Sequence, residues 1–383
     1  MLMIIMKIKS IRQVKNLAGK RVLLRADLNV PIKGGKIKDD YKIVAVLPTV
    51  RYLLRHNCRL IIATHLGQGL KGESTKPIAD RLSRLLGKKV AGREKIEKME
   101  NKEVVMLENL RWSKGEEKND KKFARALAAS ADIYVNDSFG VDHRQHASTS
   151  AIKKYLPSYA GLLLEKEILN LAKILRPEPP LVAIIGGAKI ETKINLINNL
   201  AKKSYRLLIG GALANNFIAA HGFKIGKSVA DRPSVRTAAQ IIKRHKNIIL
   251  PVDVVVAKSL KSCEARVLPV AKVGAGDMIL DIGPKTVRLF ASFIEKASTI
   301  IWNGPLGYFE NQHFKHGTLA VARVIAARST GQAFGVAGGG ETIEALKMTK
   351  MEDYLDWIST GGGAMLAFLG GEKLPGLKGI VKN

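Results

Sequence analysis

Short apolar runs alternate with amphipathic stretches along the first half of the chain. We interpret the apolar runs as buried strands at residues 21–28, 59–64, 104–107 and 133–136. The stretches between them repeat at helical spacing and predict helices over residues 42–55, 78–86, 120–131 and 165–175. Strands that alternate with helices are typical of an α/β fold built on parallel sheets.

A proline cluster interrupts this pattern near the middle of the chain. The helix predicted over residues 165–175 runs into Arg176-Pro177-Glu178-Pro179-Pro180, a sequence that stops a helix and is typical of a hinge. Beyond it, further strands are predicted at residues 181–185, 207–209, 252–256, 278–281, 299–302 and 333–337. With 383 residues, 46% of them hydrophobic, the chain is long enough for two cores, so we expect two domains.

Two glycine triplets lie near the C-terminus, in Gly338-Gly339-Gly340-Glu341-Thr342 and in Ser359-Thr360-Gly361-Gly362-Gly363-Ala364. Each follows a β-like apolar run, at residues 333–337 and 354–358, and each precedes a helix-like run, at 342–348 and 364–369. A glycine turn between a strand and a helix presents backbone N–H groups to phosphate, which favours a nucleotide or another polyphosphorylated ligand. The alternative is that these glycines only form tight turns or helix caps.

Composition narrows the class of protein. The apolar residues 1–6 are too few for a secretion signal, and no stretch approaches the length of a membrane span. Cys58 and Cys263 fall in different predicted domains, and we interpret them as buried thiols of a cytoplasmic protein rather than as a disulfide.

The net charge of +30 is dispersed over the chain. Residues 1–170 hold 34 Lys and Arg against 18 Asp and Glu, and the remainder holds 29 against 15. Such a positive field attracts anions, whether small phosphates or nucleic acid. Because no RNA- or DNA-binding motif accompanies the basic residues, we interpret most of them as a solvated surface and expect no specific nucleic-acid partner.

Polar and charged residues follow the predicted strands of the first half. Asp27 and Asn29 follow the first strand, and His65, Arg111 and Arg144 follow the next three. Ligands bind at the carboxyl edge of open α/β sheets, and arginine binds phosphate and carboxylate bidentately. The set therefore favours a small molecule with phosphate, carboxylate and hydroxyl groups. Ordinary surface ion pairs are the alternative for each arginine taken alone.

The second half supplies lysines suited to a phosphoryl group. In Ile185-Gly186-Gly187-Ala188-Lys189-Ile190-Glu191-Thr192-Lys193, a glycine turn follows a strand, and we expect Lys189 and Lys193 to share one face of the next helix. A capped helix with solvated lysines is the alternative. Glu310, after the turn Trp302-Asn303-Gly304-Pro305, is a candidate acceptor for ribose hydroxyls or else a helix-start carboxylate.

Three other motifs are not supported. The histidine pairs 143/146 and 313/316 have no cysteine or carboxylate that completes a persuasive zinc site. A Walker A loop ending at Gly226-Lys227-Ser228 lacks its first glycine, because His221 stands there, and a dinucleotide fingerprint at Gly274-Ala275-Gly276 lacks its third.

Taken together, these blocks resemble the phosphoglycerate kinase family over nearly the whole chain. The likeness is carried by eight segments in family order: residues 25–31, 64–67, 108–112, 134–140, 186–189, 281–286, 302–305 and 359–364. It implies two doubly wound, Rossmann-like α/β domains joined by a hinge helix, at residues 1–170 and 177–373, with a tail, residues 374–383, that returns to the first domain. It also implies a cytoplasmic, monomeric glycolytic enzyme that transfers a phosphoryl group from 1,3-bisphosphoglycerate to ADP after hinge closure.

The resemblance also implies roles for individual residues. The N-terminal domain would bind 3-phosphoglycerate or 1,3-bisphosphoglycerate through Asp27, Leu28, Asn29, Lys42, His65, Leu66, Gly67, Gln68, Arg111 and Arg144. The C-terminal domain would bind Mg-ADP or Mg-ATP through Gly187, Ala188, Lys189, Lys193, Asn303, Pro305, Glu310, Gly339, Gly340, Glu341 and Thr342. Glu341 would hold Mg²⁺, and catalysis would fall to Lys42, Lys193, Gly361, Gly362 and Gly363.

The chain departs from the family pattern at several of these positions. Lys42 stands where the family usually has arginine, Gln68-Gly69 where it has Arg-Pro, and Glu341 where it has aspartate. Lysine keeps the positive charge of arginine but lacks its planar guanidinium. Glutamate is one methylene longer than aspartate, which changes how its carboxylate reaches Mg²⁺, a metal with strict geometry. The competing hypothesis is therefore a catalytically weakened member that binds anions or RNA. The intact glycine motifs favour the enzyme.

Overall fold

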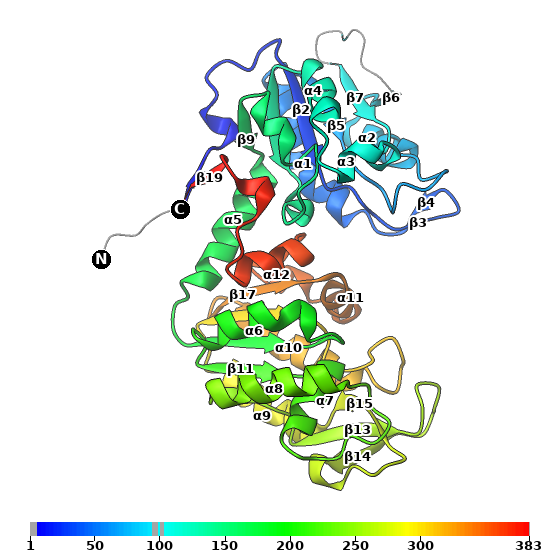
Figure 1. The fold of residues 1–383 in the computed structure, drawn as a ribbon, viewed down its shortest axis with the longest axis vertical. Helices are drawn as coiled ribbons and strands as arrows, with labels where there is room; N and C mark the ends of the chain where they lie inside the picture. The colour runs from blue at the N-terminus through cyan, green and yellow to red at the C-terminus, as the bar shows by residue number, and fades with distance from the viewer. Residues whose placement is uncertain (1–5, 94–98, 100–102, 383) are drawn as a thin grey trace. The chain divides into compact units, whose positions relative to one another are not determined.

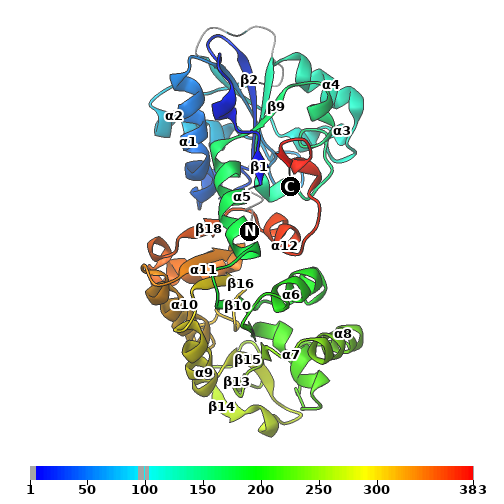
Figure 2. The same cartoon turned by 90° about the vertical axis from the view of Figure 1, so that its left-hand side faces the viewer.

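The computed structural model describes residues 6–93, 99 and 103–382. Two compact units are present, one containing residues up to 169 together with those from 373 onward, and the other containing residues 170–372. Each is an α/β unit with a six-stranded sheet, so the predicted fold class is confirmed (Figures 1 and 2). In the described part of the chain, no helix is long and apolar enough to cross a membrane.

The sheet of the first unit is parallel throughout, in the order β6-β7-β5-β2-β8-β9. Its strands are β2 (Arg21–Ala26), β5 (Arg59–Ala63), β6 (Ala91–Arg93), β7 (Val104–Leu107), β8 (Ile133–Asp137) and β9 (Ser158–Ala160). The four central strands were predicted. The two edge strands have only three residues each, too few to show a pattern. The helices of this unit are α1 (Tyr41–Arg55), α2 (Lys76–Leu86), α3 (Lys114–Glu117) and α4 (Lys121–Ala129).

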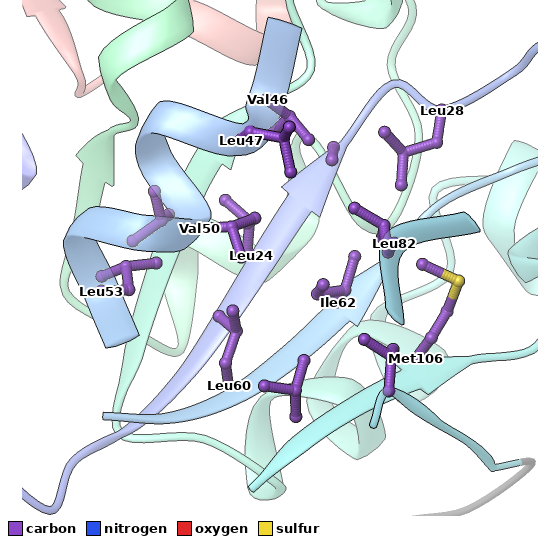
Figure 3. Packing of buried hydrophobic residues seen from close by; sticks show 14 of the residues in the cluster. Leu24, Leu28, Val46, Leu47, Val50, Leu53, Leu60, Ile62, Leu82 and Met106 are labelled. Atoms are coloured by element: carbon purple, nitrogen blue, oxygen red, sulfur yellow. The ribbon is translucent and has the colours of Figure 1, made fainter. Parts of the chain in front are cut away.

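The core of this unit forms where α1 covers the sheet (Figure 3). Val46, Val50 and Leu53 recur at helical spacing on α1 and pack with Leu24 of β2 and Ile62 of β5. All five side chains are at most 1% exposed. Burying each side chain contributes roughly 1.5–3 kcal/mol of stability. This apolar stripe therefore holds α1 against the sheet and keeps the neighbouring strand ends in place.

The end of the chain belongs to the same unit. Strand β19 (Val381–Lys382) pairs antiparallel with β1 (Lys7–Ile8). The Lys153 ammonium donates to the carbonyl oxygens of Pro375 and Gly376, at 2.7 Å each. A short hairpin, β3 (Ile32–Lys33) and β4 (Lys36–Ile37), lies between β2 and α1 in the chain.

The second unit has its own six-stranded parallel sheet, in the order β12-β11-β10-β16-β17-β18. The strands are β10 (Leu181–Ile185), β11 (Arg206–Ile209), β12 (Ile248–Ile249), β16 (Thr299–Asn303), β17 (Phe334–Gly338) and β18 (Trp357–Ser359). Helices are α6 (Ile194–Ala201), α7 (Gly211–Ala220), α8 (Arg232–Arg244), α9 (Pro284–Ile294), α10 (His316–Ser329), α11 (Gly340–Thr349) and α12 (Gly363–Leu369). Helix α5 (Leu162–Leu175) contains the boundary between the two units.

Two predicted strands do not belong to this parallel sheet. Strands β13 (Asp253–Ala257) and β15 (Met278–Ile282) pair antiparallel with each other, and β14 (Arg266–Pro269) pairs antiparallel with β13. Assigning residues 252–256 and 278–281 to the parallel alternation was therefore wrong. A parallel connection needs a long crossover, usually a helix, and the chain from β13 to β15 contains only β14 and a three-residue 3₁₀ turn.

Two smaller expectations also need correction. Residues 354–358 do not form one strand, because a 3₁₀ turn (Glu352–Tyr354) precedes the shorter β18. Cys58 is buried as expected, but Cys263 is exposed because it lies in the loop between β13 and β14.

Candidate active site

The loops after β2, β5 and β7 are hydrogen-bonded to one another at the carboxyl edge of the first sheet. The Leu28 N–H donates to Thr64 Oγ1 at 3.0 Å, and the Gly67 N–H donates to Asn29 Oδ1 at 3.0 Å. Asn109 accepts from the Leu66 N–H at 3.1 Å and donates to the Leu66 carbonyl at 2.8 Å. These bonds bring together three of the four strand ends that the sequence predicted to converge.

Asp27 and Lys42 form an ion pair at this edge. Lys42 lies in the first turn of α1, and its Nζ is 2.7 Å from Asp27 Oδ2. Burial opposes ionisation of Asp27, but the charge and hydrogen bond of Lys42, together with the other neighbouring cationic groups, outweigh it and hold the pKa of the carboxyl below its usual value. Lysine in place of the family's arginine thus remains in contact with a predicted substrate residue.

The two predicted arginines differ in their surroundings. Arg111 donates through Nη1 to the Gly67 carbonyl, and its Nε lies 3.1 Å from Glu117. Burial, and then the charge of Arg144 among its neighbours, lower the pKa of Arg111 against the opposing effect of Glu117. Arg144 is exposed and donates to His143 Nε2 at 3.3 Å. The two cations are thus close enough to repel, as expected of a site for an anion.

The remaining predicted site residues of the first unit differ in how far their side chains are exposed to solvent. Leu28 and Leu66 have buried side chains, so only their backbone groups are available to a ligand. Gln68 is exposed on the loop after Gly67. Gly69 adopts φ +80°, and a Cβ there would lie 2.6 Å from the Arg111 carbonyl oxygen, so this loop approaches Arg111 closely. Proline, which the family usually has here, cannot adopt a positive φ.

Sequence reasoning missed a buried polar cluster beneath this edge. Arg25 and Glu116 are both at most 1% exposed, and Ser148 lies between them. Arg25 Nη2 is 3.3 Å from His65 Nδ1, so the cluster reaches a predicted site residue. The available signal was a charged residue inside the apolar run of β2, where an arginine must have buried partners.

Hydrogen bonds also join the predicted loops of the second unit. The Gly186 N–H donates to the Asn303 carbonyl at 2.9 Å, and the Gly187 N–H donates to the Pro305 carbonyl at 2.7 Å. The Gly304 N–H donates to Thr342 Oγ1 at 2.7 Å, and Asn303 Nδ2 donates to the Gly338 carbonyl at 2.6 Å. The loops after β10, β16 and β17 therefore form one connected edge.

Lys189 and Lys193 do not share a helix face, contrary to the sequence prediction. Lys189 is exposed in the loop after β10, whereas Lys193 ends the 3₁₀ turn Glu191–Lys193 and is 9% exposed. Helix α6 begins only after it, because the glycine turn is followed by the 3₁₀ turn. Lys193 Nζ donates to the Gly186 carbonyl at 2.5 Å. Burial lowers the pKa of Lys193 to about 8, with Glu341 opposing the shift.

A cavity of ≈ 200 Å³ opens beside these loops. Its lining is mainly apolar and includes Gly187, Ala188, Pro305, Glu310 and Glu341 from the predicted set. Glu310 lies in a turn before α10 begins, so it is not a helix-start carboxylate. An apolar cavity with a few polar groups at its edge is typical of a small-molecule site.

The glycine triplets lie where each strand meets its helix. Gly339 precedes α11 with φ +102°, and the exposed Gly340 and Glu341 begin that helix. Gly362 precedes α12 with φ +48°, and the Gly361 N–H donates to Ser359 Oγ at 3.0 Å. The predicted strand, glycine turn and helix are present in both places.

Glu341 is suited to a magnesium ion that also binds phosphate. Mg²⁺ usually keeps several waters and takes one or two carboxylates plus substrate oxygens, so an exposed carboxylate at the cavity is the expected donor. Among the described residues there is no group of three or more His, Cys, Asp or Glu side chains that would hold a metal without a ligand.

Comparison with known proteins agrees with this arrangement. The family model described as "Phosphoglycerate kinase" matches residues 11–372. The phosphoglycerate kinase of Pelotomaculum thermopropionicum is 43% identical over 97% of this chain and 99% of its own, and that of Moorella thermoacetica is 44% identical over 96% and 98%. The structure of phosphoglycerate kinase from Coxiella burnetii has a TM-score of 0.87, with 38% identity over 97% of this chain and 98% of that one. The likeness extends through both units, and the chain accordingly belongs to the phosphoglycerate kinase family.

Proposed function

We propose that this protein catalyses reversible phosphoryl transfer from 1,3-bisphosphoglycerate to ADP, giving 3-phosphoglycerate and ATP. The observation that carries the proposal is a family match from residue 11 to 372 that includes polar, hydrogen-bonded carboxyl edges in both sheets. Phosphoryl transfer needs positioning and charge neutralisation rather than a covalent enzyme intermediate. The residues at both edges are of the types that supply these two effects.

In the first unit, we assign the phosphoglycerate site to the edge formed by the loops after β2, β5 and β7. Arg111 and Arg144 would neutralise phosphate and carboxylate, and His65 would donate to an anionic oxygen. Asn29 and Asp27 would contact hydroxyl groups, with Lys42 directed by Asp27. The other assigned positions are Leu28, Leu66, Gly67 and Gln68, the first two through their backbones.

In the second unit, we assign the nucleotide to the cavity and its glycine loops. The base and ribose would occupy the apolar lining, with Glu310 beside the ribose hydroxyls. Lys193 and the exposed Lys189 would contact phosphate oxygens, and the backbone of the Gly361–Gly363 triplet would stabilise the transferring group. The remaining positions are Gly187, Ala188, Asn303, Pro305, Gly339, Gly340 and Thr342.

Mg²⁺ would be held by Glu341 together with nucleotide phosphates. When bound, the ion neutralises phosphate charge and stabilises the developing negative charge of transfer. The neighbouring Lys193 side chain supplies a second, fixed positive charge, and Thr342 orders the turn through its bond to the Gly304 N–H.

A coupled assay of ATP consumption with 3-phosphoglycerate, with and without Mg²⁺, tests the proposal. Turnover that requires both phosphoglycerate and Mg²⁺ is expected. Nucleotide binding without turnover would instead favour the weakened, anion- or RNA-binding alternative, which would also show a steep dependence of RNA affinity on salt. A monomeric state and a cytoplasmic location are part of this proposal, and light scattering of the purified protein tests the first.

A further inference from the structure

In the buried cluster beneath the phosphoglycerate edge, side-chain chemistry fixes which atom donates and which accepts in each hydrogen bond. Arg25 Nε donates to Ser148 Oγ at 2.8 Å, and Ser148 Oγ lies 2.5 Å from Glu116 Oε1. Arginine has donors only and cannot lose its proton in proteins. The Ser148 hydroxyl must therefore accept from Arg25, and its own proton must point to the Glu116 carboxylate.

Arg25 is the donor on its other side as well. Its Nη2 lies 3.3 Å from His65 Nδ1, and because the guanidinium can only donate, Nδ1 must be the acceptor. A neutral histidine with an unprotonated Nδ1 carries its proton on Nε2. The tautomer of His65 thus follows from the chemistry of its partner.

Packing holds this geometry in place. Arg25 is 1% exposed, Glu116 0%, Ser148 1% and His65 3%. Arg25 Nη1 donates to the Ala26 carbonyl at 2.5 Å, and the Ser148 N–H donates to Glu116 Oε2 at 3.0 Å. The guanidinium and the carboxylate are therefore both anchored at more than one atom, which limits rotation of either side chain.

We propose that Glu116, Ser148 and Arg25 form a hydrogen-bond chain in which Arg25 donates toward both ends and thereby fixes His65 as the Nε2–H tautomer, which makes them positioning residues for phosphoglycerate binding. A fixed Nε2–H presents a donor to an anionic substrate oxygen, whereas the other tautomer would present a lone pair and repel it. The link to phosphoglycerate rests on the proposed function. The tautomer itself does not.

Burial and neighbouring positive charges favour the neutral form of the His65 ring. Burial, and then the positive charge of Arg25, hold the pKa of His65 well below its ordinary value, with Asp27 opposing and Arg111 and Lys42 adding to the shift. His146 also lies near the cluster, with its Nδ1 3.9 Å from Glu116 Oε1, so its signals must be separated from those of His65 in any measurement.

The first test is a ¹⁵N NMR spectrum of the full chain with labelled histidine. The protein has eight histidines, so the His65→Gln variant assigns the signals of interest. We expect His65 to be protonated on Nε2 and unprotonated on Nδ1, without change from about pH 6 to about pH 8. A proton on Nδ1, or titration of His65 in this range, would overturn the proposal.

The second test removes the obligatory donor. In Arg25→Met combined with Glu116→Gln, both buried charges are lost together, so neither is left unpaired. We expect mixed His65 tautomers and a rise of about tenfold in KM for 3-phosphoglycerate, with KM for ATP changed less than about twofold. If this variant fails to fold, Ser148→Ala removes the hydroxyl that anchors the guanidinium of Arg25, and it is expected to shift the His65 tautomer ratio in the same direction as the double variant.

Tyr134→Phe is the matched control, because the Tyr134 hydroxyl donates to the Ser148 carbonyl at 2.8 Å in the same buried region but takes no part in the chain. It is expected to keep the wild-type tautomer and KM. A single Nε2–H tautomer in the double variant, or an equal rise in KM for the control, would overturn the proposal. Absence of phosphoglycerate turnover in a wild-type protein with the expected tautomer would instead contradict the proposed function alone.

Discussion

Lys193→Met is expected to abolish phosphoryl transfer while leaving the second unit as stable as before or more stable. The lysine is 9% exposed, and its ammonium donates to the Gly186 carbonyl. Methionine has a similar length and no charge, so it fills the same space without the desolvation cost. Alanine would also remove the charge but would leave a cavity, which obscures the comparison.

The size of the effect follows from the pKa of Lys193. Burial lowers it from 10.5 to about 8, which corresponds to a cost of about 3 kcal/mol for keeping the ammonium charged in the folded state. Loss of the bond to Gly186 leaves a carbonyl without that partner and costs about 1–3 kcal/mol. We therefore expect Lys193→Met to be more stable by about 1 kcal/mol near neutral pH.

The sign of the pH dependence provides a check. Below about pH 8 the desolvation of the ammonium destabilises the wild-type protein in full, because Lys193 is charged in both the folded and the unfolded state. Between about pH 8 and 10.5 the unfolded chain binds more protons, so wild-type stability rises with pH and the difference from the variant shrinks. Calorimetry of both proteins across this pH range measures the difference in their stability, with Lys189→Met, at an exposed lysine, as control. A variant less stable than wild type by more than about 2 kcal/mol at pH 7 would refute the reasoning.

Four further predictions follow from individual contacts. With saturating phosphoglycerate, kcat/KM for nucleotide is expected to fall above about pH 8, as Lys193 loses its proton in the free enzyme; a flat profile to about pH 10 would contradict this. Lys42→Met should raise KM for 3-phosphoglycerate about tenfold by removing a partner of Asp27, whereas Lys42→Arg should not. Glu341→Ala should raise the Mg²⁺ concentration for half-maximal rate at fixed ATP, and Glu341→Asp should largely preserve it. Gly69→Ala should lower the free energy of unfolding, measured in urea, by about 2–3 kcal/mol, because its Cβ would clash with Arg111. Gly72→Ala should lower it by about 1 kcal/mol, because this glycine has φ +97° but no atom within 4 Å of an added Cβ.

The central strands were predictable because they are buried on both faces and so appear as continuous apolar runs. Strand β2 and strand β10 are examples, and every residue of β10 is buried. Edge strands such as β6 have three residues and no such signal. Helix α7 of the second unit was missed because it is apolar on most of its surface and shows little helical periodicity.

The candidate site was predictable as residue types at strand ends, but not as contacts. Asp27 and Asn29 lie at the edge as expected, yet the pairing of Asp27 with Lys42 depends on how α1 packs on the sheet. The placement of Lys193 depends on a 3₁₀ turn that periodicity does not reveal. The Arg25 cluster joins residues up to 123 positions apart, a separation that no local pattern encodes.

The two units stabilise buried positive charge in different ways, and this difference bears on ligand binding. Arg25 has a hydroxyl, a carbonyl and a ring nitrogen as acceptors, with the Glu116 carboxylate 3.9 Å away, so its charge is compensated before any ligand arrives. The hydrogen-bond partner described for Lys193 is a neutral carbonyl, and Glu341 acts on it only through its charge. An anionic phosphate beside Lys193 would supply the missing compensation. Nucleotide binding should therefore raise the pKa of Lys193 and take up a fraction of a proton near pH 8, which calorimetry in buffers of different ionisation enthalpy would detect. Binding of 3-phosphoglycerate alone should cause no proton uptake by this lysine.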